Sequence, residues 1–413
     1  MLEFISNADV GYFIVGAALM FTLLNVAAWY SLPFLRSLIT PRENSSAKSS
    51  SSACPDYIRQ NIKQWYGFGE EDWQAYINED FERRKSACVH EEFTEFKHPS
   101  FNGRYFKFSP HGFRHVEDQG QWPPLDKTYN ILFFGGSTTL NVGPDWTAIP
   151  SYLQKYLNDQ SLQKPVCVYN FGRGAYFSTQ ERILFQQLMM GKGSFDMAIF
   201  LDGLNEFYFY EGAPTTKGLF SHSLEESLRA TFSIAANQRS ARPQWGKIAD
   251  FFMTLPLAHT MELLSGAMFG NGSEKQMNYV APLDLAEEVY DEVIKRYIHN
   301  KNQIEAIAEV YNVTAVFAWQ PVPGYKYNLD HHIAIKRMPG GLLGHERSGV
   351  GYPIMKEYVE THPQGDAFIW LADIQEDMEK PLYVDHVHYT AEFSRIIAEK
   401  IGSAIVERGL FYR

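Results

Sequence analysis

The sequence predicts an α/β fold built on a parallel five-stranded sheet. Five short apolar runs, each long enough for a buried strand, alternate with segments that have helical periodicity. Strands that alternate with helices in this way form a parallel sheet covered by helices on both faces. Glycine-containing or polar motifs follow several of the runs, where open α/β sheets bind their ligands. The five predicted strands are 130–134, 166–170, 197–201, 313–318 and 367–371.

The segments between these strands carry helix signals of their own. Ser178 is expected to be an N-cap, and Glu181 three residues later completes a capping box. Thr390 is expected to cap the final helix, whose apolar residues repeat at helical spacing from Phe393 to Ile405. The predicted helices are 147–157, 178–190, 283–311 and the one that Thr390 begins.

An apolar segment near the N-terminus predicts a membrane anchor. No charged residue lies between Asp9 and Arg36, and about 20 apolar residues are enough to span a bilayer as a helix. Residues 10–35 therefore predict one transmembrane helix that contacts the lipid bilayer. A cleavable signal peptide is disfavoured because no Lys or Arg precedes the run. A buried core helix is the third interpretation.

The side of the membrane that holds the rest of the chain stays open. Arg36, Arg42 and Lys48 follow the apolar segment, which by the positive-inside rule favours the cytoplasm. The Ser-rich stretch 44–53 is instead typical of an extracytoplasmic linker, and we expect this placement for a single-pass protein. There Cys54 and Cys88 could pair.

Composition limits the partners, and changes in composition suggest the domain limits. The net charge of −11 excludes an extended basic face, so no nucleic-acid partner is expected. Three cysteines are too few for a disulfide-rich scaffold. We expect an anchor (1–36), a Ser-rich linker (37–54), an N-terminal extension (55–128) and a main domain (129–413) with cap insertions at 204–281 and 322–365.

Two of the motifs could supply a nucleophile and its base. Gly135-Gly136-Ser137 follows the first strand, and such a turn exposes a serine hydroxyl beside free backbone N–H groups. Asp385 and His388, three residues apart before the final helix, can supply an orienting carboxylate and a base. Each motif alone is an ordinary turn sequence. A metal site at His386 and His388 is disfavoured because no further ligand spacing supports it.

Two further motifs could bind an oxyanion. The glycine-rich turn 170–176 can aim a backbone N–H at developing negative charge, and the amide of Asn205 can add a second donor. Asp202 and Glu206 are interpreted as loop acids or substrate-positioning groups. Arg173 is expected either to meet an anionic substrate group or to form a salt bridge. The aromatic run 207–210 is expected to pack in the core, with a pocket lining as the alternative.

Together the four motifs resemble the SGNH, or GDSL-like, hydrolase family, in the subgroup whose first block reads Gly-Gly-Ser-Thr. The resemblance covers about 101–413 and is strongest over 129–206 and 381–405. It includes Gly103, Tyr105, Gly112-Phe113-Arg114 and Gln320-Pro321. The resemblance implies a three-layer, flavodoxin-like fold and no cofactor.

The resemblance also implies roles for single residues. Ser137 matches the nucleophile, His388 the base and Asp385 the carboxylate that orients it. The oxyanion hole would combine the N–H of Ser137, a backbone N–H of the second block and the side chain of Asn205. The subgroup has a second glycine where this chain has Ala175, so either Gly174 or Ala175 supplies that N–H.

The function implied is that of a membrane-anchored serine esterase. Its substrate would be an acyl or acetyl ester on a small molecule, a lipid or a glycan. A glycan O-acyltransferase would use the same residues, with a sugar hydroxyl in place of water. A non-catalytic glycan-binding protein is the alternative from another class, and the complete set of Ser, Asn, Asp and His disfavours it.

Overall fold

The computed structural model describes residues 63–86, 88–191, 193–211, 285–337 and 341–412, and its centre is a five-stranded parallel sheet. The strand order is β6-β5-β7-β8-β9, which is the flavodoxin-like order 2-1-3-4-5. All five predicted strands are confirmed to within one residue. They are β5 (Tyr129–Gly135), β6 (Val166–Asn170), β7 (Met197–Asp202), β8 (Thr314–Trp319) and β9 (Phe368–Trp370).

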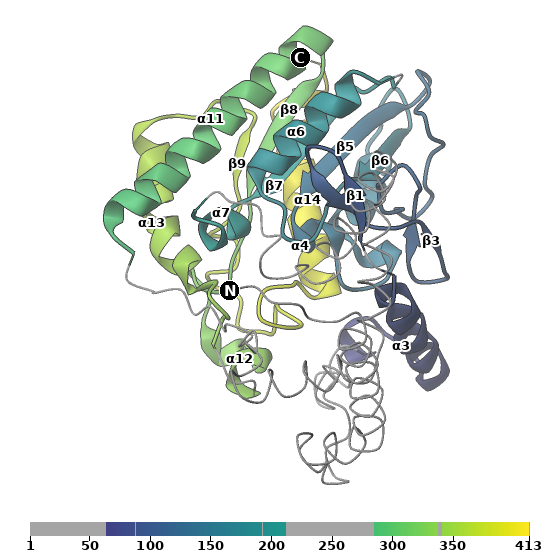
Figure 1. Ribbon diagram of the computed structural model, residues 1–413, viewed down its shortest axis with the longest axis horizontal. Helices are drawn as coiled ribbons and strands as arrows, with labels where there is room; N and C mark the ends of the chain where they lie inside the picture. The colour runs from purple at the N-terminus through teal and green to yellow at the C-terminus, as the bar shows by residue number, and fades with distance from the viewer. Residues whose placement is uncertain (1–62, 87, 192, 212–284, 338–340, 413) are drawn as a thin grey trace, which may run out of the picture. The chain divides into compact units, whose positions relative to one another are not determined.

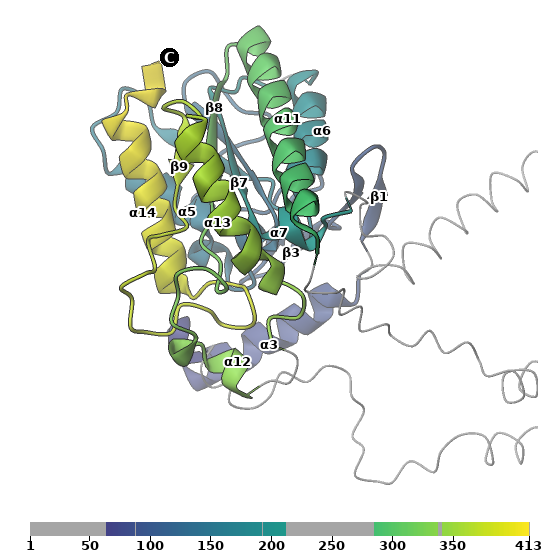
Figure 2. The same ribbon diagram turned by 90° about the vertical axis from the view of Figure 1, so that its left-hand side faces the viewer.

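Helices cover both faces of the sheet (Figures 1 and 2). On one face lie α6 (Ser178–Met189), α11 (Glu287–Tyr311) and α13 (Glu346–Thr361), and on the other α5 (Ile149–Asn158) and α14 (Ala391–Glu407). Thr390 caps α14 as predicted, since its hydroxyl accepts a hydrogen bond from the N–H of Phe393 at 3.2 Å. The described residues thus form the three layers expected of a doubly wound sheet.

Alternation along the buried strands explains why two helical layers form. In β5, Leu132 and Phe134 face the layer of α6 and α11, whereas Ile131 and Phe133 face α5 and α14. A strand that is apolar at every position can bury both faces, and burying each such side chain contributes about 1.5–3 kcal/mol. Phe134 also stacks on Phe200 of β7, with ring centroids 4.8 Å apart.

The N-terminal extension packs against the loop that follows β5. It contains α3 (Glu70–Arg84), the hairpin of β1 (Val89–Glu91) and β2 (Glu95–Lys97), and the hairpin of β3 (Phe101–Asn102) and β4 (Lys107–Phe108). Trp73, Tyr76 and Phe106 of the extension form an apolar cluster with Leu140, which ends the short helix α4 (Ser137–Leu140). The extension therefore contacts the segment that carries Ser137.

The start of α6 differs from the prediction. Its N-cap is Phe177 rather than Ser178, and Gln180 rather than Glu181 returns to the cap, with Oε1 accepting the N–H of Phe177 at 3.3 Å. Ser178 is instead the first helical residue, because its N–H is already bound by Glu206 at 2.7 Å. Tertiary contacts thus override the local capping signal.

Part of the segment 322–365, expected as a cap, belongs to the helical layer. Helix α13 connects β8 to β9 and packs its Tyr352 against Trp319 of β8, with ring centroids 5.5 Å apart. The same segment also holds η2 (Leu329–His331) and α12 (Ile333–Arg337), and η3 (Leu410–Tyr412) follows α14 near the end of the chain.

Several expectations fall outside the described residues. These are the anchor, the linker, Cys54 and all but the first eight residues of the insertion 204–281. Cys88 is described and carries a free thiol. Among the described helices, none combines the length and apolar character needed to cross a bilayer.

Candidate active site

Ser137 lies where β5 turns sharply into α4. It is half-buried and is the first residue of this one-turn helix. Gly135 has φ 154°, and a Cβ there would lie 2.0 Å from Oγ1 of Thr139. A Cβ on Gly136 would lie 2.4 Å from Nδ2 of Asn205. Both positions therefore require glycine, and the second brings the Asn205 amide against the turn that carries Ser137.

Asp385 and His388 form the predicted carboxylate–imidazole pair. Nδ1 of His388 lies 2.7 Å from Oδ2 of Asp385 and 2.9 Å from Oδ1. Oδ1 also accepts the backbone N–H groups of Val387 at 3.0 Å and His388 at 2.9 Å. Burial alone would raise the pKa of Asp385, but the His388 charge and these hydrogen bonds together hold that pKa well below its usual range.

The other ring nitrogen of His388 is available for catalysis. Nε2 is buried and has no hydrogen-bond partner within the part of the chain that the structure describes. With Nδ1 held by a carboxylate, the neutral ring carries its proton on Nδ1 and leaves Nε2 as a base. Nε2 is therefore the atom that can accept a proton from a nucleophile.

Gln320 links the segment of Ser137 to the segment of His388. Its Oε1 accepts a hydrogen bond from Thr138, next to Ser137, at 2.7 Å and another from Tyr389, next to His388, at 3.0 Å. Gln320 follows β8 directly and is 2% exposed. The predicted nucleophile and base therefore adjoin two ends of one buried hydrogen-bond network, although no described hydrogen bond joins Ser137 to His388. Apo structures often lack that contact.

Asn205 is the amide expected in the oxyanion hole. It lies on α7 (Leu204–Tyr208), and its Nδ2 donates a hydrogen bond to the carbonyl of Tyr176 at 2.7 Å. An amide nitrogen has two N–H bonds, so the second one can donate to a ligand. The carbonyl of Tyr176 would also lie 3.1 Å from a Cβ on Gly136. The two middle motifs thus meet at the turn before Ser137.

The turn 173–176 holds both candidate N–H donors. It is closed by a 3.3 Å hydrogen bond from the N–H of Tyr176 to the carbonyl of Arg173, and the N–H of Arg173 binds the carbonyl of Gly135 at 2.9 Å. Ala175 has φ 64°, a left-handed conformation that costs an L-residue about 1–2 kcal/mol. Ala175, which stands where the subgroup that the sequence resembles has a second glycine, therefore keeps a backbone conformation that favours glycine.

Arg173 serves the fold rather than an anionic ligand. Its guanidinium is buried and binds Glu91 of β1, the carbonyl of Phe96 at 2.8 Å and the hydroxyl of Tyr176 at 2.9 Å. Of the two predicted roles, the salt bridge is the one found. Arg173 thereby fixes the turn 173–176 to the hairpin of the N-terminal extension.

Asp202 and Glu206 are interior acids rather than the predicted loop acids, because Asp202 ends β7 and Glu206 lies on α7. They are 3% and 0% exposed, and they face the buried Glu181 of α6. Burial, followed by the charges of neighbouring acids, raises the pKa values of Glu181 and Asp202 well above their usual range. Arg296 of α11 pairs with Glu206 at 3.3 Å. Glu206 follows Asn205 directly on α7, so the cluster includes the residue next to Asn205.

The aromatic run after Asn205 packs mainly in the core, as the first of its two predictions stated. Phe207 and Phe209 are buried. Tyr208 stacks on the ring of His345, with centroids 4.3 Å apart. Burial, and after it the His388 charge, lowers the pKa of His345 to about 3, so this ring is neutral at physiological pH.

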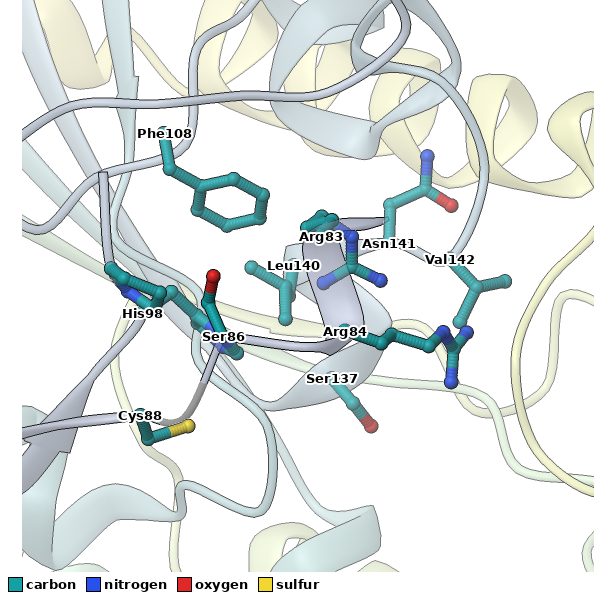
Figure 3. A pocket seen from close by; sticks show the side chains of 11 residues that line it. Arg83, Arg84, Ser86, Cys88, His98, Phe108, Ser137, Leu140, Asn141 and Val142 are labelled. Atoms are coloured by element: carbon teal, nitrogen blue, oxygen red, sulfur yellow. The ribbon is translucent and has the colours of Figure 1, made fainter. Parts of the chain in front are cut away.

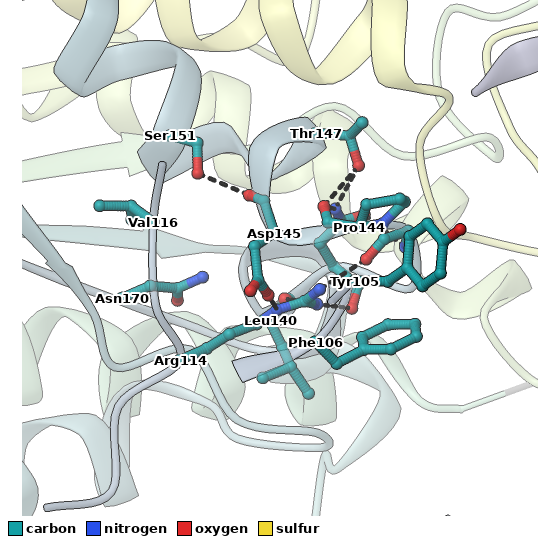
Figure 4. Close-up of polar contacts among 12 residues, drawn as sticks. Tyr105, Phe106, Arg114, Val116, Leu140, Pro144, Asp145, Thr147, Ser151 and Asn170 are labelled. Atoms are coloured by element: carbon teal, nitrogen blue, oxygen red, sulfur yellow. Dashed lines mark hydrogen bonds and ion pairs between the residues drawn. The ribbon is translucent and has the colours of Figure 1, made fainter. Parts of the chain in front are cut away.

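Arg114 secures the loop that follows Ser137 (Figure 4). Its guanidinium is 1% exposed and donates to the carbonyls of Leu140 at 2.7 Å, Asn141 at 2.6 Å and Gly143 at 2.5 Å. Its Nε binds Oδ1 of Asp145 at 2.8 Å. The sequence singled out Arg114 only through its resemblance to family members, and the structure supplies a physical reason for it.

A pocket of about 260 Å³ opens beside Ser137 (Figure 3). Its far wall comes from the N-terminal extension and includes Arg83, Cys88 and Phe108. No motif or periodicity in the sequence marks these residues as part of a pocket, and Cys88 was expected only as a possible partner of Cys54. In the described part of the chain, no group of three or more His, Cys, Asp or Glu side chains is arranged to hold a metal ion.

Comparisons with known proteins give weak likenesses only. No protein-family model matches the chain, and no curated protein matches it. One similar solved structure is a member of the lipolytic protein G-D-S-L family from Veillonella parvula, with 11% identity, a TM-score of 0.31 and coverage of 68% of this chain and 97% of that one. Another is an alpha/beta hydrolase enzyme from the metagenome of Lake Arreo, Spain, with 11% identity, a TM-score of 0.32 and coverage of 69% and 97%. Likenesses this weak do not assign a family.

Proposed function

We propose that this protein is a serine ester hydrolase of the SGNH type. The observation that carries the proposal is the His388–Asp385 pair, which leaves Nε2 unpartnered among the described residues and is linked through Gln320 to the segment of Ser137. Ser137 attacks the ester carbonyl while His388 takes its proton. The alcohol leaves with the proton from His388, and water, giving a proton to His388, then hydrolyses the acyl-enzyme and releases the acid.

The developing oxyanion has three candidate donors. These are the N–H of Ser137, the N–H of Gly174 or Ala175, and the second N–H bond of Asn205. No hydrogen bond of the described structure engages these backbone N–H groups. Each donor to an oxyanion contributes about 3–4 kcal/mol of transition-state stabilisation.

Labelling with a fluorophosphonate tests this assignment on the full chain, purified in detergent because residues 10–35 are apolar. The probe reacts with an activated serine and needs no knowledge of the substrate. We expect Ser137→Ala to abolish labelling and Ser348→Ala, which removes another buried hydroxyl, to leave it unchanged. A folded wild-type protein that does not label would contradict the proposal.

An ester screen with and without sugar acceptors then separates the two enzymatic functions. Hydrolysis at a rate independent of the acceptor supports the esterase. A glycan O-acyltransferase would turn over slowly until an acceptor hydroxyl is added. Absence of both labelling and turnover in the folded protein would favour a glycan-binding role.

We also propose that residues 10–35 anchor the protein in the bilayer, with the site on the extracytoplasmic side. The supporting observations are the uncharged apolar run and the Ser-rich stretch that follows it. Protease protection in sealed, right-side-out vesicles tests the topology. Digestion without detergent is expected, and protection would place the site in the cytoplasm.

A further inference from the structure

The pocket beside Ser137 touches only one part of the catalytic arrangement. It is lined by Ser137 and by Leu140, Asn141 and Val142, which follow it in the chain. His388, Asn205 and the turn 173–176 do not line it. A group bound in this pocket therefore contacts the nucleophile but neither the base nor the other oxyanion donors.

This arrangement determines which substituent of the ester enters the pocket. His388 must contact the leaving-group oxygen to protonate it, so the alcohol lies on the His388 side. The carbonyl oxygen lies against the oxyanion donors. The carbon chain of the acyl group is the third substituent at the carbonyl carbon, and the pocket beside Ser137 is the space that remains for this chain.

The walls of the pocket suit an uncharged chain. Phe108, Leu140 and Cys88 present apolar surface, and burial raises the pKa of the Cys88 thiol to about 11, which keeps it neutral. Burial likewise lowers the pKa of His98 to about 3. The guanidinium groups of Arg83 and Arg84 also line the pocket and share the carboxylate of Asp80, at 2.6 and 2.7 Å, and that of Arg83 lies 4.8 Å from the ring centroid of Phe106.

The size of the pocket limits the chain that it can hold. About 260 Å³ is slightly below the range of about 300–1,000 Å³ for sites that bind drug-sized ligands, and far more than an acetyl group fills. Resting on the serine hydrolase function, we propose that this pocket, closed by the N-terminal extension, binds the acyl chain and selects medium-length acyl esters over acetyl esters.

A series of p-nitrophenyl esters tests this pocket in the full chain. Each buried methylene is expected to raise kcat/KM about fourfold until the pocket is full. Cys88→Phe fills the pocket from the extension side. It should abolish the rise of kcat/KM from acetate to octanoate, whereas Cys88→Ala should keep this rise.

A second series, acetate esters of alcohols of increasing length, separates the two sides of the ester. Cys88→Phe should not change its dependence on chain length. Preference of the wild type for acetate, an equal loss on all esters in Cys88→Phe, or an effect on alcohol length would each overturn the pocket assignment. If fluorophosphonate still labels Ser137, only that assignment fails. If labelling also fails, the proposed hydrolase function is contradicted as well.

Discussion

The hydroxyl of Thr138 donates to Oε1 of Gln320 over 2.7 Å and joins positions 182 residues apart in the chain. The same oxygen accepts from Tyr389 at 3.0 Å. One buried amide oxygen thus connects the neighbour of the proposed nucleophile, Ser137, to the neighbour of the proposed base, His388. We therefore expect this bond to help set the spacing between Ser137 and His388, which lie on separate segments.

Gln320→Met should loosen this connection without leaving a cavity. The hydroxyl of Thr138 loses its acceptor, whereas Tyr389 keeps the carbonyl of Pro321 at 2.6 Å. We expect the free energy of unfolding to fall by about 1–3 kcal/mol and kcat to fall by up to about 100-fold. Urea denaturation and ester kinetics measure the two effects. Tyr389→Phe keeps the hydrogen bond between Thr138 and Gln320, so it should lower kcat less. An unchanged kcat in Gln320→Met would mean that the hydrogen bonds of Gln320 do not position the site.

Asp385→Asn should abolish most activity while preserving the fold. The N–H groups of Val387 and His388 both donate to Oδ1, so the amide oxygen of asparagine takes that position. Its NH₂ then faces Nδ1 of His388 and forces the ring proton onto Nε2. A ring in this tautomer cannot accept the proton of Ser137, and kcat should fall by about 10⁴-fold.

Steady-state kinetics and circular dichroism together measure this effect. Asp385→Ala serves as the control, because it removes the carboxylate without imposing the tautomer. A kcat that falls less than tenfold in Asp385→Asn would exclude Asp385 as the orienting group.

The parts of the site that follow strands could be predicted, and the parts that the extension supplies could not. Ser137 and Asn205 each follow a continuous apolar run, so the parallel sheet itself brings them to one edge. Cys88 directly precedes the three-residue β1 and Phe108 ends the two-residue β4, and segments this short carry no periodic pattern. Asp202 was expected as a loop acid or a substrate-positioning group because its motif resembles a polar loop, although it is the last residue of β7 and is 3% exposed.

Ala175→Gly should stabilise the protein slightly and leave the chemistry intact. Relief of the left-handed backbone gains about 1–2 kcal/mol, and the greater freedom of glycine in the unfolded chain offsets about 0.4–1 kcal/mol. A net gain of about 0–1.6 kcal/mol in unfolding free energy is expected, with kcat unchanged because the backbone N–H remains. Gly174→Ala is the control, since its Cβ meets open space. Clear destabilisation by Ala175→Gly would show that the methyl group itself is needed.

Arg114→Met should destabilise the loop after Ser137. Removing the guanidinium leaves three carbonyls without a donor and the buried Asp145 without its cation. Loss of one partner of a buried pair costs about 3–5 kcal/mol. Adding Asp145→Asn should recover part of this loss, whereas the same change alone should destabilise the wild type. Urea denaturation of the four proteins measures the coupling, and additive effects would contradict it.

Because Glu181 and Asp202 are buried, we expect the free energy of unfolding to fall as the pH rises. Burial is the main cause that raises the folded-state pKa of Glu181, and the charge of Asp202 is the second cause. Burial likewise raises the folded-state pKa of Asp202. The folded state therefore binds more protons than the unfolded chain above about pH 4, where free carboxyls titrate. Stability from this source is complete below that pH and is lost as the pH rises toward the folded pKa values, by about 1.4 kcal/mol per pH unit for each retained proton.

The double variant Glu181→Gln, Asp202→Asn replaces both titrating groups with neutral amides and should flatten this dependence. Urea unfolding at pH 5, 6, 7 and 8 gives the slopes of stability against pH. Glu292→Gln on the exposed side of α11 is the matched control and should keep the wild-type slope. Parallel slopes for the wild type and the double variant would mean that the acids are already ionised in the folded protein, with Arg296 and solvent compensating their charge.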